Sequence, residues 1–421
     1  MLIGNGKINN IYFWVITYLV ISIISNNFIA EEIHVGNEYF YKNLTSAIKA
    51  SKPHDKIILH KGKYLEHDII IDKQIELTSV ENAVIDGQNK YHIILVKADS
   101  VKISGITFIN AGISFIDDNA AVKLDSVKGC IVSNNVFDNN FFAIYLARTS
   151  DSIIKDNKIK AYTEKESYSG NGIHLWYCKN ITVENNFISG QRDGIYFEFV
   201  RDSNIKKNIS ENNLRYGLHF MFSDNCNYSN NKFVKNGAGV AVMYTKKVKM
   251  FKNEFMNNWG PASYGILLKD ISDSEIDSNL FYKNSSGIYI EGSNRININN
   301  NNFMENGWAI RLMANSMDNN FKRNNFIGNS FDVSTNSSKN FNFFENNFWS
   351  DYKGYDIDKN GIGDIPYRPV KLFSLIVEKN RPTLILLRSF FTEILDVAEK
   401  IFPVLTPETL IDSSPSMNKI L

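Results

Sequence analysis

The chain has 421 residues, of which 43% are hydrophobic and 22% are charged, and its formal net charge is +1. Because it can bury a large core, this composition excludes a chain that is disordered or embedded in a membrane throughout. The balanced charge gives no general reason to expect nucleic acid as a partner.

The first thirty residues have the layout of a secretory signal peptide. Lys7 precedes an apolar run from Ile11 to Ile24, and polar residues then lead to the small residue Ala30. A basic start, a short apolar run and a small residue at the cut are typical of such peptides. We therefore predict that residues 1–30 are a signal peptide and that the body is exported. An uncleaved membrane anchor is the alternative, although the run is shorter than the ~20 residues of a membrane span.

Residues 31–100 are predicted to form an N-terminal cap and the first coils of the fold described next. The segment from Asn43 to Tyr64 indicates a short amphipathic helix that leads into the first strands. Such a helix would cover the open end of a stack of strands, where unpaired backbone groups invite aggregation.

A tetrapeptide, x-Asn-x-(Phe/Ile), recurs through the middle of the chain. Most steps between its asparagines are 22 or 23 residues, and two are longer, at 29 and 26 residues. A column of glycine or alanine runs in phase with it, and an alternating strand such as GIHLW or GLHFM follows each member. The repeat asparagines are Asn135, Asn157, Asn186, Asn208, Asn231, Asn253, Asn279, Asn301, Asn324 and Asn346.

Short strands with a fixed period near 22 residues predict an all-β fold, a single-stranded right-handed parallel β-helix of the pectin-lyase-like kind, over residues 101–349. The phenylalanines are expected to stack inside, and the asparagines to form a ladder at a corner. The two long steps insert loops before Gly172 and Gly265, which should fringe the same face. An asparagine-rich low-complexity tract is the alternative, but it does not explain the in-phase aliphatic pairs.

The three cysteines, Cys130, Cys178 and Cys226, are expected to be free thiols buried in the core. The repeat places them on separate coils, beyond the ~7 Å limit that a disulfide sets on the distance between Cα atoms.

His219, Met221 and Met243 are predicted to lie together on the outer surface. Leu218 and Phe220 occupy the constant apolar positions of their strand, so His219 and Met221 point to the other side. Adjacent coils lie ~4.8 Å apart, which stacks Met243 on Met221. An imidazole and two thioethers form a soft ligand set of the kind that selects Cu(I). The sequence therefore predicts transient Cu(I) binding at these three residues.

His174 is a weaker candidate for the same site, because it lies two coils, or ~10 Å, from His219. Methionine and histidine that only decorate a surface or contact a partner are the alternative. A β-helix that binds or cleaves polysaccharide is another. Glycoside hydrolysis usually needs two carboxyl groups roughly 5 to 9.5 Å apart. Glu198 and Glu291 on this face are four coils, or ~19 Å, apart, so we predict that the chain is not an enzyme.

Residues 350–370 are an aspartate- and glycine-rich loop that is expected to close the stack. Four side chains match the first half of a calcium-binding loop: Asp356, Asp358, Asn360 and Asp364. These residues make calcium a candidate ligand. Position twelve of such a loop would be Tyr367, which supplies no carboxylate, so a tight turn is the favoured interpretation.

Residues 371–421 are predicted to be an amphipathic C-terminal tail. The apolar stretch from Leu384 to Phe402 carries interspersed charges, which is typical of an amphipathic helix. Such a helix either caps the last coil or docks on a partner. Its apolar surplus favours a membrane-protein partner.

Six segments carry a resemblance to a known family: NGIHLW, GLHFMFSDNC, GVAVMYTKKV, YGILLKDISDSEIDSN, FWSDYKGYDIDKNGIGDIPYRP and AEKIFPVLTPETLIDSSP. Together they resemble NosD, the family of periplasmic accessory proteins in nitrous oxide reductase maturation. The resemblance covers essentially the whole mature chain. Because generic carbohydrate-binding β-helices lack the C-terminal segment, the match is specific.

The resemblance implies a non-catalytic periplasmic protein held at the inner membrane by an ABC transporter, with a permease and an ATPase of the NosY and NosF types. It also implies a role in loading copper into the copper-sulfide centre of nitrous oxide reductase, with copper delivered by a lipoprotein of the NosL type. The C-terminal tail is then expected to engage the permease. The resemblance assigns no copper ligand, so the three candidate ligands depend on register alone.

Overall fold

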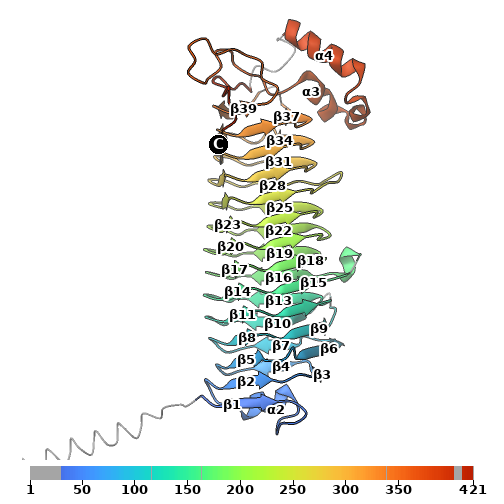
Figure 1. Cartoon of the computed structure of the whole chain (residues 1–421), viewed down its shortest axis with the longest axis vertical. Helices are drawn as coiled ribbons and strands as arrows, with labels where there is room; N and C mark the ends of the chain where they lie inside the picture. The colour runs from blue at the N-terminus through green and yellow to red at the C-terminus, as the bar shows by residue number, and fades with distance from the viewer. Residues whose placement is uncertain (1–29, 115, 163, 338, 403–409, 421) are drawn as a thin grey trace, which may run out of the picture.

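The chain winds into a long right-handed parallel β-helix with three parallel sheets along its length, as the repeat predicts (Figure 1). The structure is a computed structural model that describes residues 30–114, 116–162, 164–337, 339–402 and 410–420. Residues 1–29 of the predicted signal peptide lie outside the described residues.

Each coil between the two ends contributes one strand to each of three sheets, which we call A, B and C. Sheet A contains β1 (Glu32–Val35), β2 (Lys56–Leu59), β5 (Glu76–Ser79), β8 (Lys102–Ser104), β11 (Ile131–Ser133), β14 (Ile153–Lys155), β17 (Thr182–Glu184), β20 (Asn204–Lys206), β23 (Asn227–Ser229), β26 (Lys249–Phe251), β29 (Glu275–Asp277), β32 (Asn297–Asn299), β35 (Asn320–Lys322) and β38 (Phe343–Glu345). Sheet B contains β3 (Lys63–Tyr64), β6 (Val84–Lys90), β9 (Thr107–Ala111), β12 (Val136–Asp138), β15 (Lys158–Lys160), β18 (Phe187–Ser189), β21 (Ile209–Glu211), β24 (Lys232–Val234), β27 (Glu254–Met256), β30 (Leu280–Tyr282), β33 (Asn302–Met304), β36 (Asn325–Ile327) and β39 (Phe348–Trp349). Sheet C contains β4 (Ile69–Ile71), β7 (Ile94–Val96), β10 (Ala120–Asp125), β13 (Phe142–Ala147), β16 (Asn171–Trp176), β19 (Asp193–Glu198), β22 (Tyr216–Met221), β25 (Ala238–Met243), β28 (Ile266–Lys269), β31 (Ser286–Glu291), β34 (Trp308–Leu312) and β37 (Phe331–Thr335).

One side chain per turn fills the same place inside the stack. In sheet C, Ile173 pairs with Ile195, Ile195 with Leu218, and Leu218 with Val240, and all four are buried in one core. The aromatic rings of sheet B stack in the same way, with the Phe281 and Phe303 centroids 4.7 Å apart. Every coil therefore adds an apolar layer to a continuous core, which explains the period in the sequence.

A ladder of buried asparagine side chains runs along the corner between sheets A and B, as predicted. Each side-chain amide donates to the next side-chain oxygen, for example Asn231 to Asn253 at 3.0 Å and Asn279 to Asn301 at 3.0 Å. Each amide also donates to a backbone carbonyl of the preceding coil, such as Asn231 to Ile205 at 3.0 Å. The ladder thus satisfies backbone groups that the turn leaves unpaired.

The last asparagine of the ladder is Asn347, and the prediction of Asn346 is wrong by one residue. Asn347 accepts from Asn324 at 3.0 Å, and Trp349 stacks on Phe326 with ring centroids 4.1 Å apart. Tryptophan therefore fills the place that phenylalanine holds in the lower coils. A second buried ladder, missed in the sequence, runs along the corner between sheets B and C. It comprises Asn213, Asn236, Asn258, Asn284, Asn306 and Asn329.

The glycine column is required by the close approach of neighbouring coils. A Cβ atom on Gly217 would lie 2.7 Å from the carbonyl oxygen of Gly239 and 2.9 Å from the ring of Phe233. These distances are shorter than van der Waals contact. A side chain at this position would push adjacent coils apart.

The N-terminal end is covered by α2 (Leu44–Ala50), which confirms the predicted helix. The side chain of Asn43 caps this helix by accepting from the backbone N–H of Ser46 at 2.9 Å. Leu44, Ala47 and Ile48 are buried against the first coils. The helix therefore seals the core at this end of the stack.

The two inserted loops project from the same side of the stack at different heights, as predicted (Figure 1). The first contains η1 (Glu166–Tyr168) and leads into β16, and the second leads into β28. Both enter just before a strand of sheet C.

The other end of the stack is covered by α3 (Leu372–Lys379). Phe373 and Val377 are buried against Phe331 of β37, and Arg311 forms a 2.7 Å ion pair with Glu378. The chain continues through η2 (Arg381–Leu386) into α4 (Phe390–Ile401). The prediction of one helix from Leu384 to Phe402 is therefore wrong, because the helix begins six residues later. Among the described residues, no helix is both long enough and apolar enough to cross a membrane.

The chain then returns to the stack, so residues 371–421 do not all belong to an amphipathic tail. Asp412 is fully buried and accepts from the side chains of Asn347 and Trp349, both at 3.0 Å. Its carboxylate ends the asparagine ladder where a further asparagine would otherwise stand. Ile420 donates its backbone N–H to Asn325 at 2.8 Å.

Candidate metal-binding face

The candidate ligands lie in two adjacent rows on the outer side of sheet C. In the first row Tyr196 pairs with His219, and in the second Met221 pairs with Met243. Leu218 and Phe220 lie in the core on the opposite side of the same strand. The structure thus brings His219, Met221 and Met243 together on neighbouring strands, β22 and β25, as the register predicts.

His219 is buried although it lies on the outer side of the sheet. Its exposed fraction is 5%, and its ring packs 4.9 Å from the ring of Tyr196 and 4.8 Å from that of Tyr216. Its Nε2 makes no hydrogen bond, and its Nδ1 lies 3.5 Å from the carboxylate of Asp193. Buried polar atoms in folded proteins normally have a partner, so the unpartnered Nε2 marks this place as a candidate ligand site.

The two methionines are half-buried beside the histidine. The Tyr196 hydroxyl donates to the sulfur of Met221 at 3.6 Å. Thioether sulfur is a weak acceptor, so a soft metal ion can replace this contact at little cost. Ala241, which pairs with His219, is small and completely buried.

His174 is held away from the methionine pair. Tyr196 separates it from His219 in the row, and its Nδ1 accepts from the Asn171 side chain at 3.0 Å. Burial is the main cause that lowers the pKa of His174 to about 3, so the ring is neutral. His174 therefore packs between aromatic rings as a neutral side chain.

Three residues that sequence reasoning missed surround His219. Asp193 is completely buried, and its Oδ2 lies 3.5 Å from His219 Nδ1. Arg215 donates to both oxygens of Asp193, at 2.9 and 2.5 Å. Burial alone would raise the pKa of Asp193, but the bonds and charge of Arg215 hold it below its usual value. The third is Tyr196. The sequence did contain one sign of Asp193. At the position just before the column glycine this coil has an acidic residue, whereas the next two coils have Tyr216 and Ala238 there.

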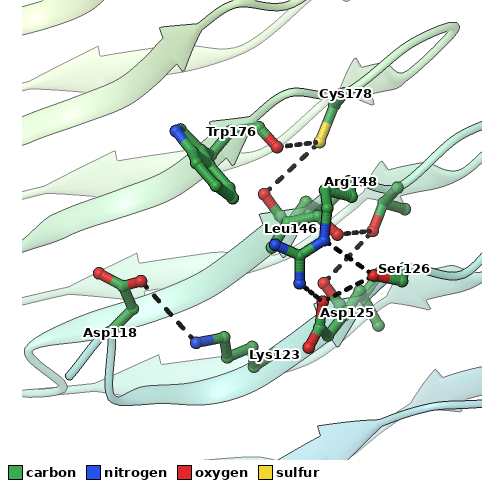
Figure 2. A network of polar contacts seen from close by, with 11 residues as sticks. Asp118, Lys123, Asp125, Ser126, Leu146, Arg148, Trp176 and Cys178 are labelled. Carbon is green, nitrogen blue, oxygen red and sulfur yellow. Dashed lines mark hydrogen bonds and ion pairs between the residues drawn. The ribbon is translucent and has the colours of Figure 1, made fainter.

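The part of the face nearer the N-terminus carries charged side chains that pair with one another. Figure 2 shows Arg148 donating to Asp125 at 2.6 Å, and Lys123 lying 3.9 Å from Asp118. The Arg148 guanidinium also lies 5.5 Å from the Trp176 ring. These charged side chains bind one another. The candidate ligands for a soft metal ion therefore lie farther along the face, around His219.

Cys178 follows Trp176 by two residues and is buried, and Figure 2 shows its sulfur near two backbone carbonyls. Its thiol approaches the carbonyls of Leu146 and Trp176 at 3.5 and 3.4 Å. Burial raises the pKa of Cys178 to about 12, so it offers no thiolate to a metal. Cys130 and Cys226 are likewise buried and free, which confirms the prediction for the cysteines.

Four of the five other histidines form two small groups near the N-terminus. His34 Nδ1 lies 2.8 Å from His60 Nε2, and His67 and His92 both approach Asp68, at 2.9 and 3.6 Å. No three His, Cys, Asp or Glu side chains of the described residues gather as a metal site.

The predicted calcium loop is a hydrogen-bonded turn. Asp356 accepts from the backbone N–H groups of Asn360 and Gly361, at 3.1 and 2.8 Å. Asp358 accepts from the Asn360 side chain at 2.8 Å, and Asp364 accepts from a backbone N–H of the loop at 2.7 Å. The loop's own amides thus use these oxygens, which supports the turn and gives no support to calcium.

Glu198 and Glu291 lie too far apart on this face to act together in glycoside hydrolysis. Glu198 lies on β19 and Glu291 on β31, and β22, β25 and β28 separate them in sheet C. Four strand spacings amount to ~19 Å. This distance is about twice the largest separation that either hydrolytic mechanism uses.

Comparisons with known proteins agree with the resemblance seen in the sequence. Residues 160–357 match the family described as periplasmic copper-binding protein, NosD. The chain is 29% identical over 378 residues to a probable ABC transporter binding protein NosD of Pseudomonas aeruginosa, with 85% of this chain and 87% of that protein covered. It is 28% identical to the protein of that name from Stutzerimonas stutzeri, with 85% and 86% covered.

Solved structures confirm the fold. The catalytic unit of a GH87 α-1,3-glucanase from Streptomyces thermodiastaticus matches with a TM-score of 0.57 at 13% identity, over 73% of this chain and 65% of that one. A family 28 exopolygalacturonase from Yersinia enterocolitica matches with a TM-score of 0.54 at 9% identity, over 75% and 78%. At these identities the likeness concerns the backbone fold alone.

Proposed function

We propose that the chain is a periplasmic accessory protein of the NosD family that handles Cu(I) and works with an ABC transporter. The observation that carries this proposal is the pairing of Met221 with Met243 beside the buried imidazole of His219, whose Nε2 has no hydrogen-bond partner. The relatives named as transporter binding proteins support the partner, and the family description supports copper.

The donor set suits a cargo ion that must be released again. Thioether and imidazole ligands prefer Cu(I) to harder ions. His219, Met221 and Met243 carry no formal charge as ligands, so they hold the ion more weakly than thiolates would. We propose that Cu(I) arrives from a lipoprotein of the NosL type, rests on this face, and is passed towards the copper-sulfide centre of nitrous oxide reductase.

Replacing both methionines tests the copper site. We expect Met221→Leu with Met243→Leu to weaken Cu(I) binding on the order of 100-fold, because two of three ligands are lost while volume is conserved. Anaerobic competition titration with a Cu(I) chelator measures the affinity, and loading of the reductase centre in cells should fall in parallel. His219→Ala should also weaken binding.

The same substitution on another wall provides the control. Met256→Leu with Met304→Leu changes two half-buried methionines of sheet B and should leave the affinity unchanged. Equal affinities for wild type and the Met221/Met243 variant would refute the site. A wild-type protein that retains no Cu(I) would instead support the alternative of a docking scaffold without bound metal.

Helix α4 is the proposed contact with the transporter permease. Phe390, Ile394, Val397 and Ile401 are between 49% and 75% exposed along this 12-residue helix. Apolar side chains grouped in this way mark an interaction surface. Because α3 already covers the last coil, α4 is free to bind a partner of apolar character, such as the periplasmic surface of a permease.

A single charge on α4 tests this contact. Ile394→Glu should weaken co-purification with the permease by about 30-fold or more, as expected for an apolar contact at the centre of an interface. Ile70→Glu, at a residue of equal exposure, 49%, on the N-terminal coils, is the matched control. Cu(I) affinity should be unchanged in both variants. Wild-type recovery of the permease with Ile394→Glu would exclude α4 as the docking helix.

A further inference from the structure

A buried carboxylate lies next to the imidazole of the proposed copper ligand His219. Asp193 opens β19 and has no exposed surface. In the next coil Tyr216 takes its register position, and His219 follows three residues later on the same strand. An ionised carboxylate without solvent is costly and persists only where specific partners hold it.

Arg215 and the backbone fix the position of this carboxylate. The guanidinium holds both oxygens in a bidentate pair, at 2.9 and 2.5 Å, and the Tyr216 backbone N–H approaches Oδ1 at 3.3 Å. The Arg215 side chain itself stacks over the Tyr216 ring, 5.1 Å from its centroid. Asp193 Oδ2 is therefore held in one place, 3.5 Å from His219 Nδ1.

We infer that Asp193 is a positioning residue that holds His219 in the form in which Nε2 binds Cu(I). A negative charge beside Nδ1 favours the tautomer with the proton on Nδ1, which leaves the lone pair on Nε2. His219 Nε2 is buried and has no hydrogen-bond partner. The tyrosine rings on either side restrict rotation of the imidazole. This inference rests on the proposed copper function.

Asp193→Asn tests the inference, because it keeps the size of the side chain and removes the charge. Loss of a residue that orients a metal-bound histidine typically weakens binding by about 10- to 100-fold. We expect such a loss in anaerobic Cu(I) competition titration. X-ray absorption of the Cu(I)-loaded protein should show weaker nitrogen scattering at unchanged sulfur scattering.

Asp273→Asn is the matched control. Asp273 makes the same bidentate pair with Arg295, at 2.7 and 3.0 Å, on an exposed surface. This variant should bind Cu(I) as wild type does. A double-mutant cycle separates positioning from a purely structural role, because Asp193→Asn should have no further effect once His219 is alanine.

The outcomes distinguish this inference from the proposed function. Wild-type affinity in Asp193→Asn, or an equal loss in the His219→Ala background, would overturn the positioning role and leave the copper function standing. A wild-type protein without Cu(I) affinity would overturn both. If Asp193→Asn does not fold, Arg215→Lys is the second test. Lysine keeps the positive charge at position 215 but cannot make the bidentate pair that fixes the Asp193 carboxylate. It should weaken Cu(I) binding several-fold, and an unchanged affinity would then overturn the inference.

Discussion

Asn279→Ala is expected to lower the free energy of unfolding by about 4 kcal/mol, since several buried polar groups lose a partner at about 1–3 kcal/mol each. The side-chain oxygen of Asn279 accepts from the backbone and side chain of Asn253, at 2.8 and 3.0 Å. Its amide donates to Asn301 and to the carbonyl of Met250, at 3.0 and 2.9 Å. Alanine replaces none of these contacts, and the site has no access to water.

Urea unfolding followed by circular dichroism measures this loss, and hydrogen exchange at the Asn253 amide reports it locally. Asn297→Ala is the control, because Asn297 is exposed on β32 and its change should fall within about 0.5 kcal/mol. Coils contact only their neighbours, so unfolding of this stack need not be two-state. Similar midpoints for the two variants would mean that the ladder contributes little to stability.

The fold was readable from the sequence because identical coils repeat the same physical requirements. Glycine is needed where Gly217 meets the next coil, and asparagine where the turn leaves backbone groups unpaired. Each requirement recurs in phase, so a few positions predict the register of the whole stack. The same regularity predicts from the sequence alone that Met221 lies beside Met243, as the strand pairing shows.

The errors occur where the repeat ends. The doublet of Asn346 and Asn347 offers two registers. The stacking of Trp349 on Phe326 and the hydrogen bond from Asn324 to Asn347 select the second. Asp412 closes the ladder from a segment without periodicity, 65 residues beyond its partner Asn347. No local pattern in the sequence announces such a contact.

The burial of His219 could not be read from register either. Register gives the side of the sheet on which a residue lies, but it does not show what covers that residue. Here the cover comes from Tyr196 of the preceding coil and from Tyr216 at the start of the same strand. The Asp193 carboxylate and its arginine likewise come from different coils. Their proximity follows from pairing of β19 with β22, and it becomes informative only once the distances between side chains are known.

A second carboxylate, Asp332, stands where the stack ends. It takes the place in β37 that the small Ala309 holds in β34, and its exposed fraction is 6%. Asn329 donates to it at 3.2 Å. Asp351 and Lys371, which form a 2.8 Å ion pair, are the nearest charges that affect it. Burial raises the pKa of Asp332 to about 7.

Asp332→Asn should therefore stabilise the C-terminal end of the stack at pH 8 and have little effect at pH 4. The folded pKa lies above the ordinary value near 3.9, so the wild type loses stability as pH rises from about 4 to about 7. Three pKa units correspond to about 4 kcal/mol as an upper limit. The asparagine variant carries no such penalty, because its amide does not ionise. Urea unfolding at both pH values, followed by the fluorescence of buried Trp349 in the neighbouring coil, measures the difference. Equal stabilisation at pH 4 and pH 8 would show that ionisation of Asp332 is not its cause.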